Sequence, residues 1–162
     1  MSERDLTAQE TTEFRQCSEA GLRLLALDSA ASPLQCVEAV ETYVDKWHKP
    51  KPGILAKLFG GKPDVVQTAL ALGAVWGDQL SREFGWEWTC HQAEGQDLYC
   101  VASKDRSLAI FPTYFLKACL DSPAVDCTAT LAFNMVKAGA IPPLPSNGYQ
   151  NLMDGVHRIV PK

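Results

Sequence analysis

Residues 86–100 read WEWTCHQAEGQDLYC, a stretch with two tryptophans, two cysteines and one histidine. Such a cluster fits the wall of an active or metal site, and it also fits one hairpin of a packed core. Apolar and polar residues alternate from Trp86 to His91, and Glu94-Gly95 is a turn signal. We therefore expect an antiparallel hairpin with strands near 86–92 and 97–103.

The centre of each turn sets the expected register of the strands. With the first turn centred on Gly95, the opposed pairs are Cys90 with Cys100, Trp88 with Ala102, and His91 with Tyr99. A second turn centred on Asp105 adds a strand near 107–111, and it pairs Ala102 with Leu108 and Cys100 with Ile110. The stretch thus predicts a three-stranded antiparallel meander.

Successive side chains of a strand point to opposite faces of a sheet, so this register predicts both faces. One face is almost wholly apolar and should pack against helices: Trp86, Trp88, Cys90, Leu98, Cys100, Ala102, Leu108 and Ile110. The other is mixed and half-exposed, as is common in small antiparallel sheets: Glu87, Thr89, His91, Tyr99, Val101, Ala109 and Phe111. The C-terminal tail could cover this second face, or the face could serve for binding.

On this register the two cysteines line the core, and His91 lies at the surface beside Tyr99. Core thiols are the favoured interpretation. A cross-strand disulfide between Cys90 and Cys100 and a functional thiol remain the alternatives.

Helices are expected on both sides of the meander. The first runs over 8–27, with Thr7 and Glu10 at capping-box spacing, and the second begins at Pro33, with Ser32 and Gln35 in the same arrangement. A third runs from 63 or 64 to Phe84 and is capped by Gly85. Its two interior glycines, Gly73 and Gly77, each cost about 1 kcal/mol against alanine, so we expect close approach of another helix or of the sheet.

Two shorter helices, near 113–120 and 125–138, follow the meander. The proline-rich stretch from 141 is irregular, and residues 148–160 form a last short helix or an extended tail. Helices, then a meander, then helices is an α+β pattern with the C-terminal helices packed on one sheet face. We expect one domain over 1–162, with a helical part at 1–62, the helix–meander–helix part at 63–139 and an irregular tail at 140–162.

Composition narrows the class of protein. The 162 residues are 46% hydrophobic and carry a formal charge of -4, which is typical of a globular domain and favours neither nucleic acid nor a membrane as partner. The N-terminus lacks the pattern of a signal peptide, and no apolar stretch is long enough to span a membrane, so we expect the cytoplasm. The six cysteines contain no CxxC pair, which argues against a zinc site.

No catalytic or cofactor motif is recognisable, so we expect no cofactor, no metal and no catalytic residues. Gly60-Gly61-Lys62 lacks the spacing of a phosphate-binding loop. A nucleophilic pair of Cys119 and His157 is a formal alternative, since such residues meet only in space.

Charged residues gather in two places. Asp78, Glu83 and Glu87 lie near the end of the third helix, where they form either a solvated face or an acidic patch for a cationic partner. Residues 48–64 are rich in lysine, and they read either as a solvated linker or as a mobile loop that contacts a partner.

The stretch from LALGAVWGDQLSREFGWEW through DRSLAIFPTYFLKACLDSP resembles a family of small bacterial proteins of unknown function. Some similar proteins look like immunity proteins, which protect bacteria from secreted antibacterial toxins of type VI or contact-dependent systems. The resemblance covers residues 66–139. Its shared features are glycines, tryptophans and a proline at element junctions, so it implies a fold and brings no catalytic residue with it.

The favoured function is therefore a non-catalytic binding protein, most specifically an immunity protein that occludes the active site of a cognate toxin. A nuclease or another enzyme with a basic surface would be attracted by acidic groups. The candidate partner-binding residues are Asp78, Glu83, Glu87, His91, Glu94, Tyr99 and Asp105. The alternative is a small enzyme or ligand-binding protein with a pocket beside Trp76, Trp86 and Tyr114, lined by Cys119 or His157.

Overall fold

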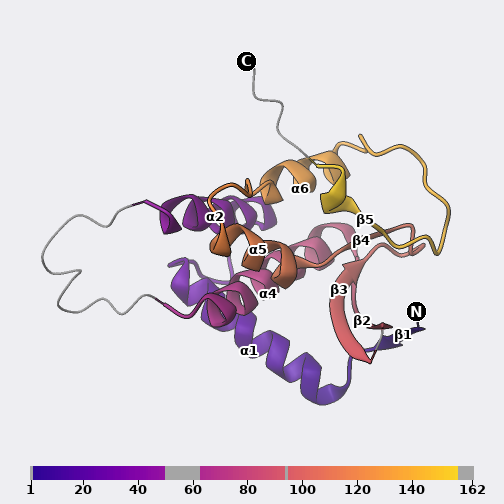
Figure 1. The fold of residues 1–162 in the computed structure, drawn as a ribbon, viewed down its shortest axis with the longest axis horizontal. Coiled ribbons are helices and arrows are strands. Elements are labelled where there is room, and N and C mark those ends of the chain that lie inside the picture. The colour runs from indigo at the N-terminus through magenta and orange to yellow at the C-terminus, as the bar shows by residue number, and fades with distance from the viewer. Residues whose placement is uncertain (1, 50–62, 94, 157–162) are drawn as a thin grey trace, which may run out of the picture.

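The computed structural model describes residues 2–49, 63–93 and 95–156. Within these residues, five α-helices pack together, and a five-stranded sheet lies at one end of them (Figure 1). The predicted α+β class is confirmed. Most of the lysine-rich stretch at 48–64 lies outside the described residues. None of the described helices is both long enough and apolar enough to cross a lipid bilayer.

Two capped helices come first in the fold. Helix α1 spans Ala8–Leu24, and α2 spans Pro33–Trp47. Both predicted capping boxes are present, formed by Thr7 with Glu10 and by Ser32 with Gln35. They satisfy N–H groups in the first turns that would otherwise lack partners.

Helix α4, Val65–Phe84, is the centre of the molecule. It packs against α1, α2 and α5, which spans Pro112–Asp121. At the N-terminus of α4, the Asp64 side chain accepts a backbone hydrogen bond. Gly85 ends the helix with a φ of 67°, a value that favours glycine.

The interior glycines of α4 are explained by two close approaches, as predicted. A side chain at Gly73 would overlap the backbone of Thr113 in α5. A side chain at Gly77 would overlap the indole of Trp88. Gly73 thus allows α5 to pack closely against α4, and Gly77 allows the sheet to do so.

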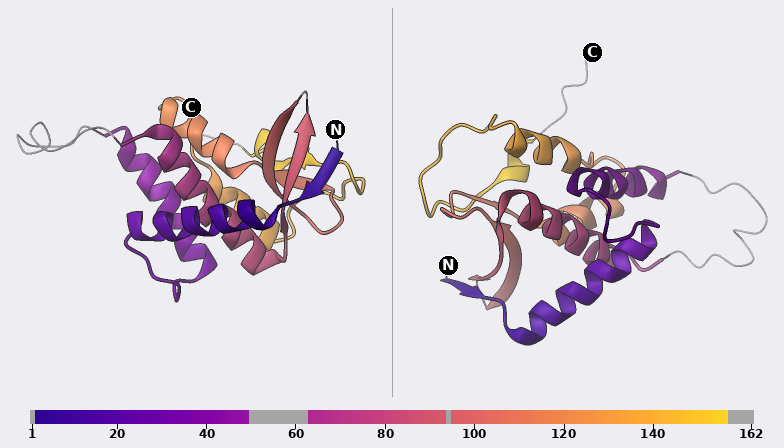
Figure 2. Two further views of the ribbon diagram at one scale, coloured as in Figure 1. Left: turned by 90° about the horizontal axis from the view of Figure 1, so that it is seen from below. Right: turned by 180° about the vertical axis from the view of Figure 1, so that it is seen from behind.

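The sheet has the order β1-β2-β3-β4-β5. Its strands are β1 Ser2–Asp5, β2 Glu87–Ala93, β3 Gln96–Ala102, β4 Leu108–Ile110 and β5 Gln150–Asn151. The first four are antiparallel, and β5 runs parallel to β4. Figure 2 shows β1 along the edge of the sheet, beside the N-terminus. The prediction of a three-stranded sheet is therefore wrong, because the meander is only the middle of a mixed sheet.

The predicted register is also wrong, by one residue. The observed pairs are Trp88 with Val101, Thr89 with Cys100, Cys90 with Tyr99 and Ala102 with Ala109. Ala93 pairs with Gln96, so the first turn has an even number of residues and cannot be centred on Gly95. A slip of one residue moves a strand's side chains to the other face. Cys90 and Cys100 consequently point to opposite faces, although both are fully buried.

Both faces of the sheet are covered. On one face Trp88 packs against Phe14 of α1, with ring centroids 4.4 Å apart. On the other face the ring of Tyr149, from the C-terminal segment, meets His91 edge-on at 4.4 Å. Of the two alternatives for the mixed face, cover by the C-terminal part of the chain is the one observed.

The last elements close the core. Helix α6 spans Ala129–Lys137, and a 3-10 helix, η1, spans Leu152–Asp154. Helix α6 starts later than predicted: the chain turns at Ser122, whose carbonyl accepts from the Val125 N–H, and residues 126–128 are not helical. The tail expected to be irregular from 140 contains β5 and η1.

Candidate functional site

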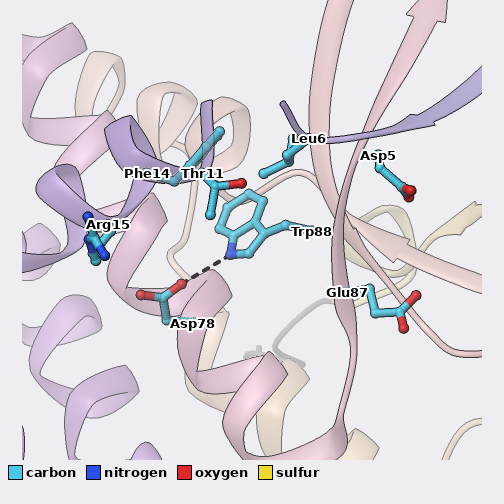
Figure 3. Close-up of a pocket in the computed structure, with 8 residues that line it drawn as sticks. All are labelled: Asp5, Leu6, Thr11, Phe14, Arg15, Asp78, Glu87 and Trp88. Atoms are coloured by element: carbon cyan, nitrogen blue, oxygen red, sulfur yellow. Dashed lines mark hydrogen bonds between the residues drawn. The ribbon is translucent and has the colours of Figure 1, made fainter. Parts of the chain in front are cut away.

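An open pocket of about 470 Å³ lies where β1, α1, α4 and β2 meet (Figure 3). We call it the Trp88 pocket. Three carboxylates, one arginine and a wall of apolar side chains line it: Asp5, Leu6, Thr11, Phe14, Arg15, Asp78, Glu87 and Trp88. Carboxylates thus outnumber cationic groups along its lining.

Asp78 is the most confined of these carboxylates. It follows Gly77 in α4, and Gly77 is the residue that admits the Trp88 ring to the helix. The Trp88 Nε1–H donates to Asp78 Oδ1 over 3.1 Å, and Ser18 of α1 provides a second hydrogen bond. The sequence Gly-Asp therefore does two things: glycine makes room for an indole, and aspartate accepts its N–H.

The environment of Asp78 disfavours its charge. Burial raises the pKa of this carboxyl, while the hydrogen bonds from Ser18 and Trp88 and the more distant Arg82 act in the opposite direction. Both hydrogen-bonding partners are neutral. Asp78 is thus a half-buried carboxylate with no cation in direct contact among the described residues.

Trp88 forms the rigid floor of the pocket. Its indole lies between Phe14 on one side and Gly77 on the other, with the Phe14 and Trp88 rings tilted by 36°. Phe14 also meets the edge of Tyr99, at 5.3 Å between centroids. The apolar wall is therefore fixed by packing on both sides.

The remaining carboxylates stand at the rim. Figure 3 shows Asp5 and Glu87 on the far side of the strand from Asp78 and Arg15. Glu87 is 61% exposed and accepts from Arg106 over 2.7 Å. Asp5 is exposed and forms no ion pair with any described residue.

A second charge cluster, beside the pocket, is internally satisfied. Arg4 donates to Glu10 and to Asp97, each over 2.8 Å. Tyr99 donates its O–H to Glu10 over 2.6 Å. These bonds from Arg4 and Tyr99 lower the pKa of Glu10, and the hydrogen bond to Glu10 raises the pKa of Tyr99 to about 12. The cluster ties β1 and the start of α1 to the hairpin, which is a structural task.

The structure brings only part of the predicted binding set together. Asp78 and Glu87 line the Trp88 pocket, and Tyr99 stands behind its wall, engaged with Glu10. Glu83 lies apart, paired with Lys137 of α6 over 2.7 Å. Glu94 lies outside the described residues.

Asp105 and His91 have structural surroundings. Asp105 accepts from the Ser103 and Ser107 hydroxyls and from the Ser107 N–H, and these bonds lower the pKa of Asp105. They fix the turn between β3 and β4. His91 is 2% exposed, so its prediction as a surface contact is wrong. His91 lies on the predicted face, opposite that of Trp88, but the ring of Tyr149 covers this face instead of leaving it half-exposed.

Sequence reasoning assigned Trp88 to the core face and not to a site, and it missed five further side chains of the pocket: Asp5, Leu6, Thr11, Phe14 and Arg15. They come from β1 and the start of α1, whose position beside β2 is a tertiary contact. The contact of Trp88 with α4 could have been found from the sequence, since Gly77-Asp78 is followed by a tryptophan-rich strand.

The pocket predicted beside Trp76, Trp86 and Tyr114 is present only in part. An open pocket of about 350 Å³, the Tyr114 pocket, is lined by Leu98, Phe111, Tyr114, Phe115, Asn151, Met153 and Asp154. Trp76 is fully buried and Trp86 is 7% exposed, and neither lines it. Cys119 is fully buried and also absent from its lining. His157, its suggested partner, lies outside the described residues, within which no cluster of metal-ligating side chains occurs.

Comparison of the chain with protein-family models, with curated proteins and with solved structures finds no match. The resemblance of residues 66–139 to small bacterial proteins therefore stays a prediction. The geometry of the Trp88 pocket supplies the argument for function.

Proposed function

We propose that this protein is a non-catalytic binding module that holds a basic side chain of a partner protein in the Trp88 pocket. We further propose that the partner is an antibacterial toxin, which the module neutralises by occluding its active site. The first proposal rests on Asp78, a half-buried carboxylate whose hydrogen-bond donors are neutral. The resemblance of the central segment to immunity-like proteins supports the second.

Asp78 is suited to a cation because its present partners are neutral. A carboxylate can accept about four hydrogen bonds, and Asp78 accepts from Trp88 and Ser18. Partial burial makes its charge costly, and an ammonium or guanidinium group would offset that cost with a charge-assisted hydrogen bond.

The rest of the pocket fits the shape and charge of such a side chain. The rings of Phe14 and Trp88 offer an apolar wall for the aliphatic stem of lysine or arginine, which commonly packs on apolar surface while its charged end is solvated or paired. Asp5 and Glu87 at the rim would attract the cation during approach.

An affinity experiment tests the pocket. The tagged protein is used as bait in a lysate of the source cells, beside a double variant that carries both Asp78→Asn and Glu87→Gln (the pocket variant). Captured proteins are quantified by mass spectrometry. We expect one stoichiometric partner that the double variant binds at least tenfold more weakly, since removing one member of a buried charge pair costs about 2–5 kcal/mol.

Two matched variants control for charge alone. Asp121→Asn removes an exposed carboxylate of α5 that pairs with Lys117, and Glu83→Gln removes the predicted contact that lies outside the pocket. Both should capture the partner as the unmodified protein does. Equal capture by the pocket variant and by these controls would contradict the proposal.

The toxin role has its own test. The gene for the captured partner is expressed with and without this protein, and growth of the host is followed. We expect growth to be restored by the unmodified protein and by Asp121→Asn, and much less by the double pocket variant. A partner that leaves growth unaffected would reject the toxin role while leaving the pocket proposal intact.

The Tyr114 pocket favours a second candidate, a carrier of a small aromatic or apolar ligand. Three of its seven lining residues are aromatic and two more are apolar, and Tyr114 is 45% exposed. Native mass spectrometry of the purified protein would show a bound small molecule that Tyr114→Ala loses. A spectrum of ligand-free protein together with a captured toxin would decide for the binding module.

A further inference from the structure

No disulfide joins any of the six cysteines among the described residues, and their placement decides which pair can react. Cys90 and Cys100 are the pair that the hairpin sequence suggests. They point to opposite faces of the sheet, because Cys90 pairs with Tyr99 and Cys100 pairs with Thr89. Disulfide geometry requires Cβ atoms about 3.5–4.5 Å apart with converging directions, which this arrangement excludes.

Cys119 and Cys127 are brought together by a chain reversal. Cys119 lies in the last turn of α5, and Cys127 lies just before α6. Between them the chain turns back at Ser122 and Pro123. The Cys119 Sγ reaches the carbonyl of Asp126 at 4.0 Å, and Cys127 is the next residue along the chain.

The environment of this pair is dry. Cys119 is 0% exposed and Cys127 is 2% exposed, within the core cluster that also contains Leu116 and Leu120. The hydrogen bond with Cys119 and burial raise the pKa of Cys127, so little thiolate is present at neutral pH. Because thiolates are the attacking species, oxidation should be slow in the closed protein and faster when residues 122–128 open.

We propose that Cys119 and Cys127 form a redox-sensitive modification site, at which a small disulfide oxidant such as oxidised glutathione converts the two thiols into an intramolecular disulfide. One thiolate attacks the oxidant and displaces a reduced glutathione, and a mixed disulfide results. The second thiolate then attacks the protein-bound sulfur and displaces the other glutathione. Both protein thiol protons end on the two released thiols, and the protein sulfurs are oxidised as glutathione is reduced.

Peptide mapping tests the pairing directly. The full-length protein is incubated in oxidised or reduced glutathione and then unfolded in denaturant, where free thiols are blocked with N-ethylmaleimide. It is afterwards digested with trypsin. Cleavage after Lys117 and Lys137 places both cysteines on the 118–137 peptide. We expect this peptide to become two hydrogens lighter and unblocked in the oxidised sample, while the 83–104 peptide, which carries both Cys90 and Cys100, stays blocked.

Thermal unfolding gives a second readout. A disulfide that closes a short loop of this kind should raise the melting temperature of the oxidised protein by roughly 5–10 °C over that of the reduced protein. Cys127→Ala should lose this difference, and Cys90→Ala should keep it. Since each variant is compared with itself, a loss of basal stability does not affect the result.

Two outcomes would overturn the inference. One is a first disulfide that joins any other pair of cysteines. The other is a 118–137 peptide that stays fully blocked under conditions that oxidise the same protein in denaturant.

Discussion

At the scale of single residues, Asp78 and His91 show how burial acts on polar side chains. Asp78 has two neutral hydrogen-bond donors, and its pKa is raised by burial. His91 is more deeply buried, and neither ring nitrogen has a hydrogen-bond partner among the described residues. A cationic ligand would stabilise the charged form of Asp78. Burial of His91 without a partner is tolerated only while the imidazole is neutral.

His91 should therefore make folding sensitive to acid. Burial lowers the pKa of His91, with Glu3 opposing this effect and Arg106 adding to it. A base with a lowered folded-state pKa takes up its proton first in the unfolded chain, so stability is lost as pH falls below about 6.5. The loss levels off once pH passes below the folded-state pKa.

Thermal melts between pH 7.5 and 5 check this expectation. The slope from one such histidine is at most about 1.4 kcal/mol per pH unit. His91→Phe keeps a ring against Tyr149 and should show a flatter dependence over this range. His48→Phe is the comparison, because His48 is exposed. Equal slopes for the unmodified protein and His91→Phe would contradict the argument.

At the scale of elements, close approach fixes the arrangement. Gly21 of α1 abuts the backbone of Ala71 in α4, Gly73 abuts α5, and Gly77 abuts Trp88 of the sheet. Helix α4 thus meets α1, α5 and the sheet at positions where one of the two surfaces lacks a side chain. The contact at Gly77 places the Trp88 indole against α4, and Trp88 forms the floor of the pocket.

Gly77→Ala should destabilise the protein although alanine is the better helix former. Propensity favours alanine by about 1 kcal/mol, but the new methyl group would overlap the Trp88 indole, and overpacking typically costs about 1–3 kcal/mol or more. We expect a net loss in urea unfolding and a changed tryptophan fluorescence. Gly77→Ala combined with Trp88→Leu should recover part of the stability.

An exposed position of the same helix provides the control. Gln67→Ala alters α4 where the side chain is exposed, and it should change stability by less than about 0.5 kcal/mol. A Gly77→Ala protein as stable as Gln67→Ala would show that the indole can move away, and would weaken the account of the pocket floor.

At the scale of the whole molecule, ion pairs and hydrogen bonds join β1 and the segment before β5 to the hairpin. Arg106 donates to Glu3 of β1 over 3.0 Å and to Glu87 of β2 over 2.7 Å. Tyr149 donates its O–H to Glu3 and its backbone N–H to the Arg106 carbonyl. One arginine therefore holds together the first strand, the β3–β4 turn and the segment that leads into β5.

Arg106→Gln should loosen both outer strands without unfolding the core. We expect faster amide hydrogen exchange in β1 and β5, and unchanged exchange in the middle of α4, which is buried among other helices and should open only on global unfolding. Lys117→Gln removes an exposed pair within α5 and should leave all three segments unchanged. Uniformly faster exchange across the molecule would instead show that Arg106 stabilises the whole fold and not the two outer strands alone.

The fold was predictable where its causes are local. The capping boxes at Thr7 and Ser32 and the helix stop at Gly85 follow from residues at most three positions apart. The glycines at 73 and 77 predicted only that something would approach α4 closely, and the tertiary structure decided which surfaces do. The site was predictable only in part for the same reason. Asp78 and Glu87 flank the end of one helix and the strand after it, whereas Asp5 and Phe14 reach the pocket from the other end of the chain.

The sequence alone determined the α+β class, the main helices and the central hairpin, because periodicity and turn chemistry act over short distances. The tertiary structure decided the register, the outer strands and the state of His91. Register depends on the length of a turn that the residue types left ambiguous by one position, and that position moves every side chain of a strand to the other face. β1 and β5 have no apolar pattern of their own, and they pair only because the folded core presents an edge beside them.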